Sequence, residues 1–133
     1  MNLKLKSSPY RTHIDAFFAE LHATFERNPL NESETIIGQA VVQLRHMIFY
    51  GAVSIDFIRA LEQGAGHASA ALRMVTDLAD KHGVTMLLSP SPLPHYAQRR
   101  RDALSKAQLT AWYERNGFVL ERKYDMFRYP KSK

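Results

Sequence analysis

A glycine-containing junction in the middle of the chain constrains the fold more than any other feature. Before it, residues 53–58 (Val-Ser-Ile-Asp-Phe-Ile) alternate with the period of two that is typical of a half-buried strand. After it, apolar side chains recur at helical spacing from Ala71 to Ala79. The connecting residues 63–68 are Gln-Gly-Ala-Gly-His-Ala. The pattern predicts a strand, a tight turn and a helix in succession, which is typical of a sheet covered by helices.

The turn is also suited to binding an anion. The first turn of a helix presents unpaired backbone N–H groups at the positive end of the helix dipole. No Ser, Thr, Asp or Asn stands at the junction to cap these groups, so a bound phosphate or pyrophosphate would satisfy them. Two glycines are equally typical of an ordinary tight connection, and both interpretations stay open at this point.

The other segments predict further helices and strands. The expected helices cover residues 12–27 (with Thr12 as its cap), residues 66–82, and a stretch that begins at the Ser105/Gln108 capping box. The expected strands are two within residues 36–58 that meet near Gly51, a buried strand at 84–89, and a strand or hairpin at 118–129; residues 31–35 are expected to form a polar turn. This order predicts a single domain over residues 1–133 of the α/β (α+β) class.

Composition excludes several classes of protein. The chain has no cysteine, which excludes disulfides, thiolate metal sites and a cysteine nucleophile and fits a reducing, cytoplasmic setting. No apolar run approaches the roughly 20 residues of a membrane span, so we expect no membrane segment. No two histidines stand at helical ligand spacing with a carboxylate, and we predict no metal site.

The charge points to an anionic partner. The net charge is +5, which suits nucleic acid, a phosphorylated cofactor or an acidic protein. The basic residues are not interleaved with aromatic residues as in proteins that read single-stranded nucleic acid. Nucleic acid is therefore the least favoured of the three.

Two motifs together resemble the GNAT superfamily of N-acetyltransferases. Gln63-x-x-Gly66-x-Ala68, at the head of a helix that follows a strand, is similar to the family's acetyl-CoA signature, Gln/Arg-x-x-Gly-x-Gly/Ala. Further along, Tyr113 lies in a segment that ends in Gly117-Phe118, similar to the family's second landmark. The strand expected at 84–89 stands where the family places the strand that splays from its neighbour to admit the cofactor. The resemblance covers about residues 52–129 and implies a GNAT-like, mostly antiparallel sheet flanked by helices, with a compressed N-terminal part.

The resemblance implies acetyl-CoA as the cofactor and places it along the junction. Backbone amides of the turn would hold the pyrophosphate, and backbone groups of the preceding strand would pair with the pantetheine arm like an added strand. The cofactor-binding residues implied in this way are Phe57, Ile58, Arg59, Gln63, Gly64, Ala65, Gly66, His67 and Ala68.

The catalytic residues that the resemblance suggests are Tyr113 and Asp56. Tyr113 occupies the position of a general acid that would protonate the departing CoA thiolate, and its alternative is a half-buried aromatic residue of the core. Asp56 interrupts an apolar strand beside the cofactor site and is a candidate base, although it would also fit a solvent-facing position. His46 is a second candidate base, and a structural histidine is the simpler interpretation.

The function expected from this resemblance is acetyl-CoA-dependent transfer of an acetyl group to an amine acceptor of unknown identity, a small molecule or a protein. One alternative is a GNAT-fold protein that binds CoA in a regulatory role, and another is a small basic nucleic-acid-binding protein. The proline-rich stretch 89–104 is expected to form a wall of the acceptor pocket, with Arg99, Arg100 and Arg101 either binding an anion or solvated. An exposed terminal strand with Tyr124, Met126, Phe127 and Tyr129 would be able to pair with a second copy as a homodimer.

Overall fold

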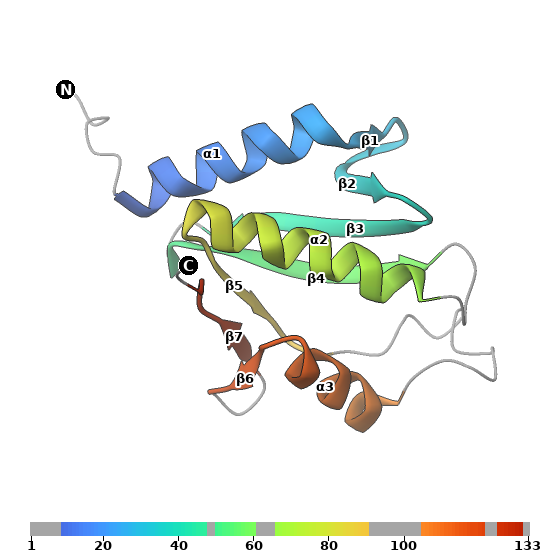
Figure 1. Cartoon of the computed structure of the whole chain (residues 1–133). Helices are drawn as coiled ribbons and strands as arrows, with labels where there is room; N and C mark the ends of the chain where they lie inside the picture. Colours follow the sequence, from blue (N-terminus) through green and yellow to red (C-terminus); the bar gives the residue numbers. More distant parts are fainter. Residues whose placement is uncertain (1–8, 48–49, 61–65, 91–104, 122–124, 132–133) are drawn as a thin grey trace.

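The computed structural model describes residues 9–47, 50–60, 66–90, 105–121 and 125–131. These residues form three helices and a seven-stranded sheet (Figure 1). In chain order the elements are α1 (Pro9–Thr24), β1 (Glu26–Asn28), β2 (Asn31–Ile37), β3 (Ala40–Met47), β4 (Ala52–Ala60), α2 (His67–His82), β5 (Thr85–Leu88), α3 (Lys106–Arg115), β6 (Val119–Leu120) and β7 (Met126–Arg128).

The sheet is mixed and mostly antiparallel. Its strand order is β1-β2-β3-β4-β5-β7-β6, and only the β4–β5 pair is parallel. The crossover between these two parallel strands contains α2, as the strand–turn–helix pattern of the sequence requires. The predicted class, a GNAT-like sheet flanked by helices with a compressed N-terminal part, is confirmed.

All three described helices contribute to one core on the same face of the sheet. In α1 the buried side chains recur at helical spacing as Ile14, Phe17 and Leu21, and in α2 Leu72 and Val75 are fully buried. The cluster also includes alternate residues of β3 and β4 and one aromatic residue of α3. Figure 1 shows α2 in front of β3 and β4, with α1 alongside α2. The opposite face of the sheet carries no helix within the described residues.

β4 and β5 diverge after a short pairing. The point of divergence, just beyond Ser54 on β4 and Leu87 on β5, is called the fork below. β4 pairs with β3 from Ala52 to Ala60, but it pairs with β5 only over Ala52, Val53 and Ser54. The β3–β4 register also shifts: Leu44 pairs with Ile55 while Gln43 pairs with Phe57, so that Asp56 is an extra residue on β4. A bulge of this kind bends the strand and changes which side chains share a face.

The predicted ends of α2, the predicted start of α3 and the predicted C-terminal hairpin are confirmed. Gly66 precedes α2 with φ of 76°, and Gly83 follows it with φ of 68°. Ser105 and Gln108 form the reciprocal capping box at the start of α3. Residues 118–129 contain the two strands of a hairpin, β6 and β7.

Three details of the prediction are wrong. The stretch 31–35 is not a turn, because the two-residue turn at Gly38 (φ of 60°) and Gln39 makes Asn31–Ile37 a strand paired with β3. Helix α1 begins at Pro9 rather than after Thr12, since proline fits the first helical position, and it ends at Thr24 rather than at 27, because Glu26–Asn28 pair with β2 as strand β1. The terminal strand is not a sheet edge: β7 lies between β5 and β6, and Met126 is fully buried.

Candidate active site

The fork leaves one edge of β4 open at its C-terminal half. Beyond Ser54, the described residues of β5 do not pair with β4, although β4 continues for six more residues to Ala60. Backbone N–H and C=O groups in protein interiors are almost always paired, so this edge is suited to an extended ligand that adds hydrogen bonds like a strand. Three predicted cofactor-binding residues, Phe57, Ile58 and Arg59, lie on this open stretch.

The N-terminus of α2 follows the open edge in the sequence, and no described side chain caps this helix. Gly66 adopts the left-handed conformation, its carbonyl accepts the first helical bond from Ala70, and the space where a Cβ would stand is open. The amides of His67 and Ala68 therefore belong to an uncapped first turn, which is the arrangement that binds anions. Gln63, Gly64 and Ala65, the other predicted residues of the turn, lie outside the described residues.

The first turn of α2 is held in place by α3. The indole Nε1 of Trp112 donates a hydrogen bond of 2.9 Å to Ser69 Oγ. Because Trp112 and Tyr113 are adjacent on α3, this bond couples the position of Tyr113 to the start of α2. The sequence did not indicate this bond, since the two residues are 43 positions apart.

Tyr113 lies on the helix side of the fork. Its side chain is 5% exposed and packs between the rings of Trp112 and Phe118, in the same cluster as Ile55 and Leu88. Burial raises the pKa of Tyr113 to about 12, so the phenol is protonated at neutral pH. No described residue forms a hydrogen bond with this hydroxyl group, which is unusual for a buried tyrosine.

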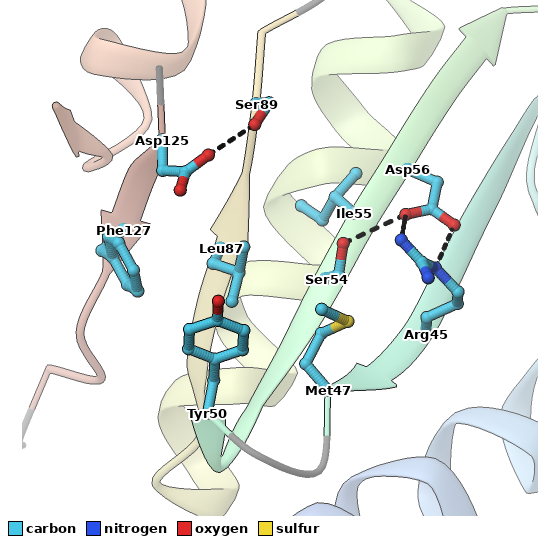
Figure 2. A pocket seen from close by; sticks show the side chains of 10 residues that line it. All are labelled: Arg45, Met47, Tyr50, Ser54, Ile55, Asp56, Leu87, Ser89, Asp125 and Phe127. Carbon is cyan, nitrogen blue, oxygen red and sulfur yellow. Dashed lines mark hydrogen bonds and ion pairs between the residues drawn. The ribbon is translucent and has the colours of Figure 1, made fainter. Parts of the chain in front are cut away.

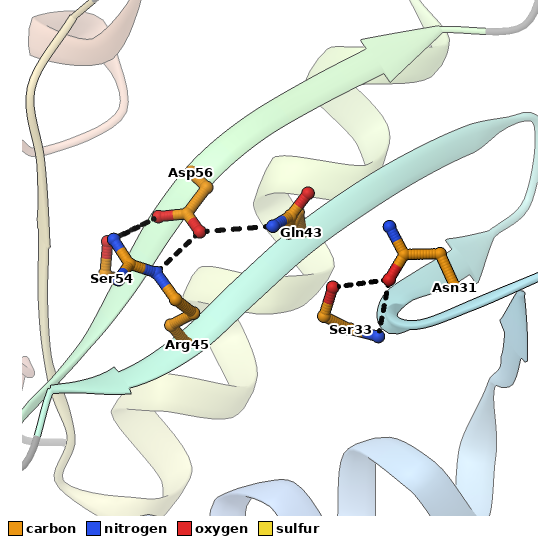
Figure 3. A network of polar contacts seen from close by, with 6 residues as sticks. All are labelled: Asn31, Ser33, Gln43, Arg45, Ser54 and Asp56. Atoms are coloured by element: carbon orange, nitrogen blue, oxygen red, sulfur yellow. Dashed lines mark hydrogen bonds and ion pairs between the residues drawn. The ribbon is translucent and has the colours of Figure 1, made fainter.

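Asp56 lies on the opposite, helix-free face and is bound by four donors (Figure 3). Arg45 Nε and a terminal nitrogen of the same guanidinium donate to its two carboxylate oxygens at 2.7 and 3.0 Å. Ser54 Oγ donates at 3.0 Å and Gln43 Nε2 at 3.3 Å. The carboxylate in turn raises the pKa of Arg45 through its hydrogen bonds and charge. Since a carboxylate accepts about four hydrogen bonds, the described neighbours occupy the acceptor sites of Asp56.

A pocket of about 340 Å³ opens on this helix-free face at the point where the strands diverge (Figure 2). Figure 2 shows the helices behind the strands and the side chains of the pocket in front of them. The residues that line it come from β3, β4, β5, β7 and the segments beside them: Arg45, Met47, Tyr50, Ser54, Ile55, Asp56, Leu87, Ser89, Asp125 and Phe127. On the β5 side of the fork, where β5 and β7 pair, Ser89 Oγ donates a hydrogen bond of 2.6 Å to Asp125.

The two predicted catalytic residues are thus on opposite faces of the sheet, with the fork between them. Asp56 lines the pocket and Tyr113 does not, and His46 lies on β3 outside the pocket lining. Sequence reasoning missed Arg45, Ser89 and Asp125. The cross-strand partner of Ser54 is Arg45, which the sequence reveals only if the register is known. The predicted pocket wall at 89–104, including Arg99–Arg101, lies outside the described residues except for Ser89 and Pro90.

Comparison with known proteins gives one structural likeness. No family model matches the chain. No curated protein matches it either. Among solved structures, the anti-CRISPR protein AcrVA5 is similar, with a TM-score of 0.53 and 19% sequence identity over 71% of this chain and 94% of AcrVA5. At this identity the likeness concerns the fold, which is GNAT-like in both proteins.

No described helix is long and apolar enough to cross a membrane. Within the same residues, no group of three or more histidine, aspartate or glutamate side chains is placed to hold a metal ion.

Proposed function

We propose that this protein is an acetyl-CoA-dependent N-acetyltransferase. The observation that carries the proposal is the continuity of the open β4 edge with the uncapped N-terminus of α2. An unpaired strand edge suits the two amides of a pantetheine arm, and a helix N-terminus suits its pyrophosphate. These two features follow each other along the chain in the order that CoA requires.

The residues present fit this ligand. The main chain of Phe57, Ile58 and Arg59 would bind the pantetheine arm, and the amides of Gly66, His67 and Ala68 would bind the pyrophosphate, joined by Gln63, Gly64 and Ala65 of the turn. When bound, acetyl-CoA supplies an acetyl group activated as a thioester. In the transfer, the amide C–N bond forms and the thioester C–S bond breaks. An ammonium acceptor loses two protons, one ending on sulfur and one in solvent.

Tyr113 supplies the proton that ends on sulfur in this proposal. Burial raises the pKa of its hydroxyl group from 10.0 to about 12, so the phenol holds its proton at neutral pH, as an ordinary tyrosine also does. The hydroxyl group also has no hydrogen-bond partner among the described residues. It is therefore free to donate a hydrogen bond to a ligand atom at the fork. The unpaired hydroxyl group favours the general acid over the alternative of a purely structural aromatic residue. The ring itself packs in the core in either case.

Asp56 acts as a positioning residue rather than as the base. Four donors already bind its carboxylate, and a general base needs a free lone pair directed at the proton that it abstracts. The bidentate Arg45 pair and the extra residue in the β4 register instead fix the shape of the strand where it leaves β5.

Titration with acetyl-CoA followed by an amine panel tests the proposed function. A ligand present at about 100 times its dissociation constant adds roughly 2.7 kcal/mol to the free energy of unfolding, which is easily measured as a thermal shift. Release of free thiol that depends on an amine would then show transfer. Binding without thiol release would favour a regulatory CoA-binding protein. Absence of any shift would overturn the proposal and leave nucleic acid as the ligand to test.

A further inference from the structure

The pocket on the helix-free face gives access to the fork from the side opposite α2. Ser54 and Leu87 form the last pair between β4 and β5, and both line the pocket. Ile55 and Ser89, which lie just past this pair on the two strands, line it as well. A molecule in the pocket therefore contacts the fork directly, while the N-terminus of α2 stays available on the other face.

The described side chains that line the pocket have a net charge opposite in sign to that of the whole chain. Its ionisable side chains include two carboxylates, Asp56 and Asp125, against one guanidinium, Arg45. Asp56 and Arg45 neutralise each other as a bidentate pair. Asp125 is bound by the uncharged hydroxyl group of Ser89, and no described cation pairs with it. The described lining of the pocket therefore carries one negative charge in excess, although the chain as a whole is +5.

The rest of the lining is apolar and the volume is small. Met47, Leu87 and Phe127 form one side, and Leu87 and Phe127 are almost fully buried. The volume of about 340 Å³ is near the lower end of the roughly 300–1,000 Å³ that ligand pockets span. A small molecule, or one side chain of a larger one, fits this space.

We propose that the acetyl acceptor is a small amine with one positive charge and an apolar body, and that Asp125 recognises its ammonium group. This inference rests on the proposed acetyltransferase function. Ser89 Oγ, at the end of β5, donates to Asp125 beside β7 and orients the carboxylate, and the apolar wall binds the body of the amine. The local charge outweighs the net charge of the chain, because exposed charges farther away than about 10 Å are largely screened by salt.

The test compares matched ligands on the intact protein. Phenethylamine is the monocationic probe, 2-phenylethanol its neutral counterpart, putrescine a dication without an apolar body, and a short lysine peptide represents a protein acceptor. Dissociation constants are measured by NMR titration without CoA, and kcat and KM with acetyl-CoA present. We expect phenethylamine to bind most tightly. Weaker binding of phenethylamine than of its neutral counterpart, or preference for the peptide, would overturn the inference.

Variants assign the recognition to Asp125. Asp125→Asn should raise the KM for phenethylamine about tenfold or more with kcat little changed, since bonds to charged groups are the strong ones. Ser89→Ala should show a smaller rise, and Asp77→Asn, which changes an exposed carboxylate on α2, should show none. An unchanged KM in Asp125→Asn, with acetyl-CoA binding retained, would refute the role of Asp125 and leave the acetyltransferase proposal standing. If the protein binds phenethylamine but not acetyl-CoA, the acetyltransferase proposal is refuted, whereas recognition of the amine by the pocket stands.

Discussion

At the scale of single residues, Tyr113 combines deep burial with a hydroxyl group that no described residue binds. Tyr113→Phe removes that hydroxyl and little else. We expect kcat to fall by about 100-fold or more, the usual size of a general-acid contribution, while the dissociation constant of CoA stays the same. Stability should not fall, because no described hydrogen bond is lost. Steady-state kinetics and calorimetric CoA titration measure both quantities.

Tyr129 provides the matched control for this change. Its hydroxyl group donates to Glu121 on the β6 side of the sheet, and it does not line the pocket. Tyr129→Phe should therefore leave kcat unchanged. Equal kcat values for the two variants would contradict the assignment of Tyr113.

A substitution of Asp56 distinguishes a positioning role from a role as general base. Asp56→Asn keeps an acceptor oxygen for Arg45 but removes the charge. If Asp56 positions the strand, kcat should fall less than about tenfold and the pH profile of kcat should keep its shape; loss of a base costs about 100-fold or more. An exposed carboxylate on α1, changed in Asp15→Asn, is the control. Loss of one limb of the pH profile in Asp56→Asn would restore Asp56 as the base.

At the scale of elements, the start of α2 carries the predicted anion site. Asp and Asn have nearly the same shape, and both are among the residues that tolerate a positive φ best, so Gly66→Asp and Gly66→Asn strain the backbone similarly. A Cβ at this position meets open space. We expect Gly66→Asp to weaken CoA binding far more than Gly66→Asn, because only the former places a negative charge beside the pyrophosphate. Equal dissociation constants from calorimetric titration would contradict the phosphate site.

The elements that the sequence could predict are those whose ends are determined by neighbouring residues. Both ends of α2 and the start of α3 follow from signals within a few residues, namely Gly66, Gly83 and Ser105 with Gln108. β2 was missed because its polar first half is typical of a turn, and only the hairpin at Gly38 makes it a strand.

The site was less predictable because its partners are distant in sequence. Asp56 meets Gln43 and Arg45 across a shifted register, and Ser89 meets Asp125 from a position 36 residues away. Residue patterns identify where a strand ends, but they do not specify which side chains a fork brings together. The sequence therefore predicted an anion site at the start of α2, whereas the pocket on the other face of the sheet emerged only from the structure.

At the scale of the whole molecule, one buried ion pair ties the last strand to the central helix. Arg128 on β7 is 4% exposed and donates to both carboxylate oxygens of Asp80 on α2, at 2.8 and 3.0 Å. Its Nε also donates to the carbonyl of Asn116 after α3, and the backbone N–H of Lys131 donates to Asp80. The pair therefore joins α2, the end of α3 and the C-terminal strand.

Breaking this pair should destabilise the protein severely. Asp80→Asn leaves the buried guanidinium without its counter-charge, and removal of one partner of a buried pair typically costs about 3–5 kcal/mol. Urea unfolding measures the change in the free energy of unfolding. Lys81, next in sequence, pairs with Glu20 on the protein surface, and Lys81→Met should cost less than about 1 kcal/mol. A loss in Asp80→Asn no larger than in Lys81→Met would contradict a structural role for the buried pair.

The pH dependence of stability follows from the same carboxylate. The hydrogen bonds from Arg128 are the main reason that the pKa of Asp80 lies below its ordinary value of 3.8. Above that value the carboxylate is ionised in the folded and unfolded states, and the full stabilisation is present. As the pH falls below it, the unfolded state takes up the proton first, so the stabilisation is lost progressively until the folded state is protonated too. The difference in unfolding free energy between the wild type and Asp80→Asn should therefore be constant down to about pH 5 and shrink as the pH falls from about 5 to 3. A difference that stays constant over this range in urea titrations would show that the charge of Asp80 does not stabilise the fold.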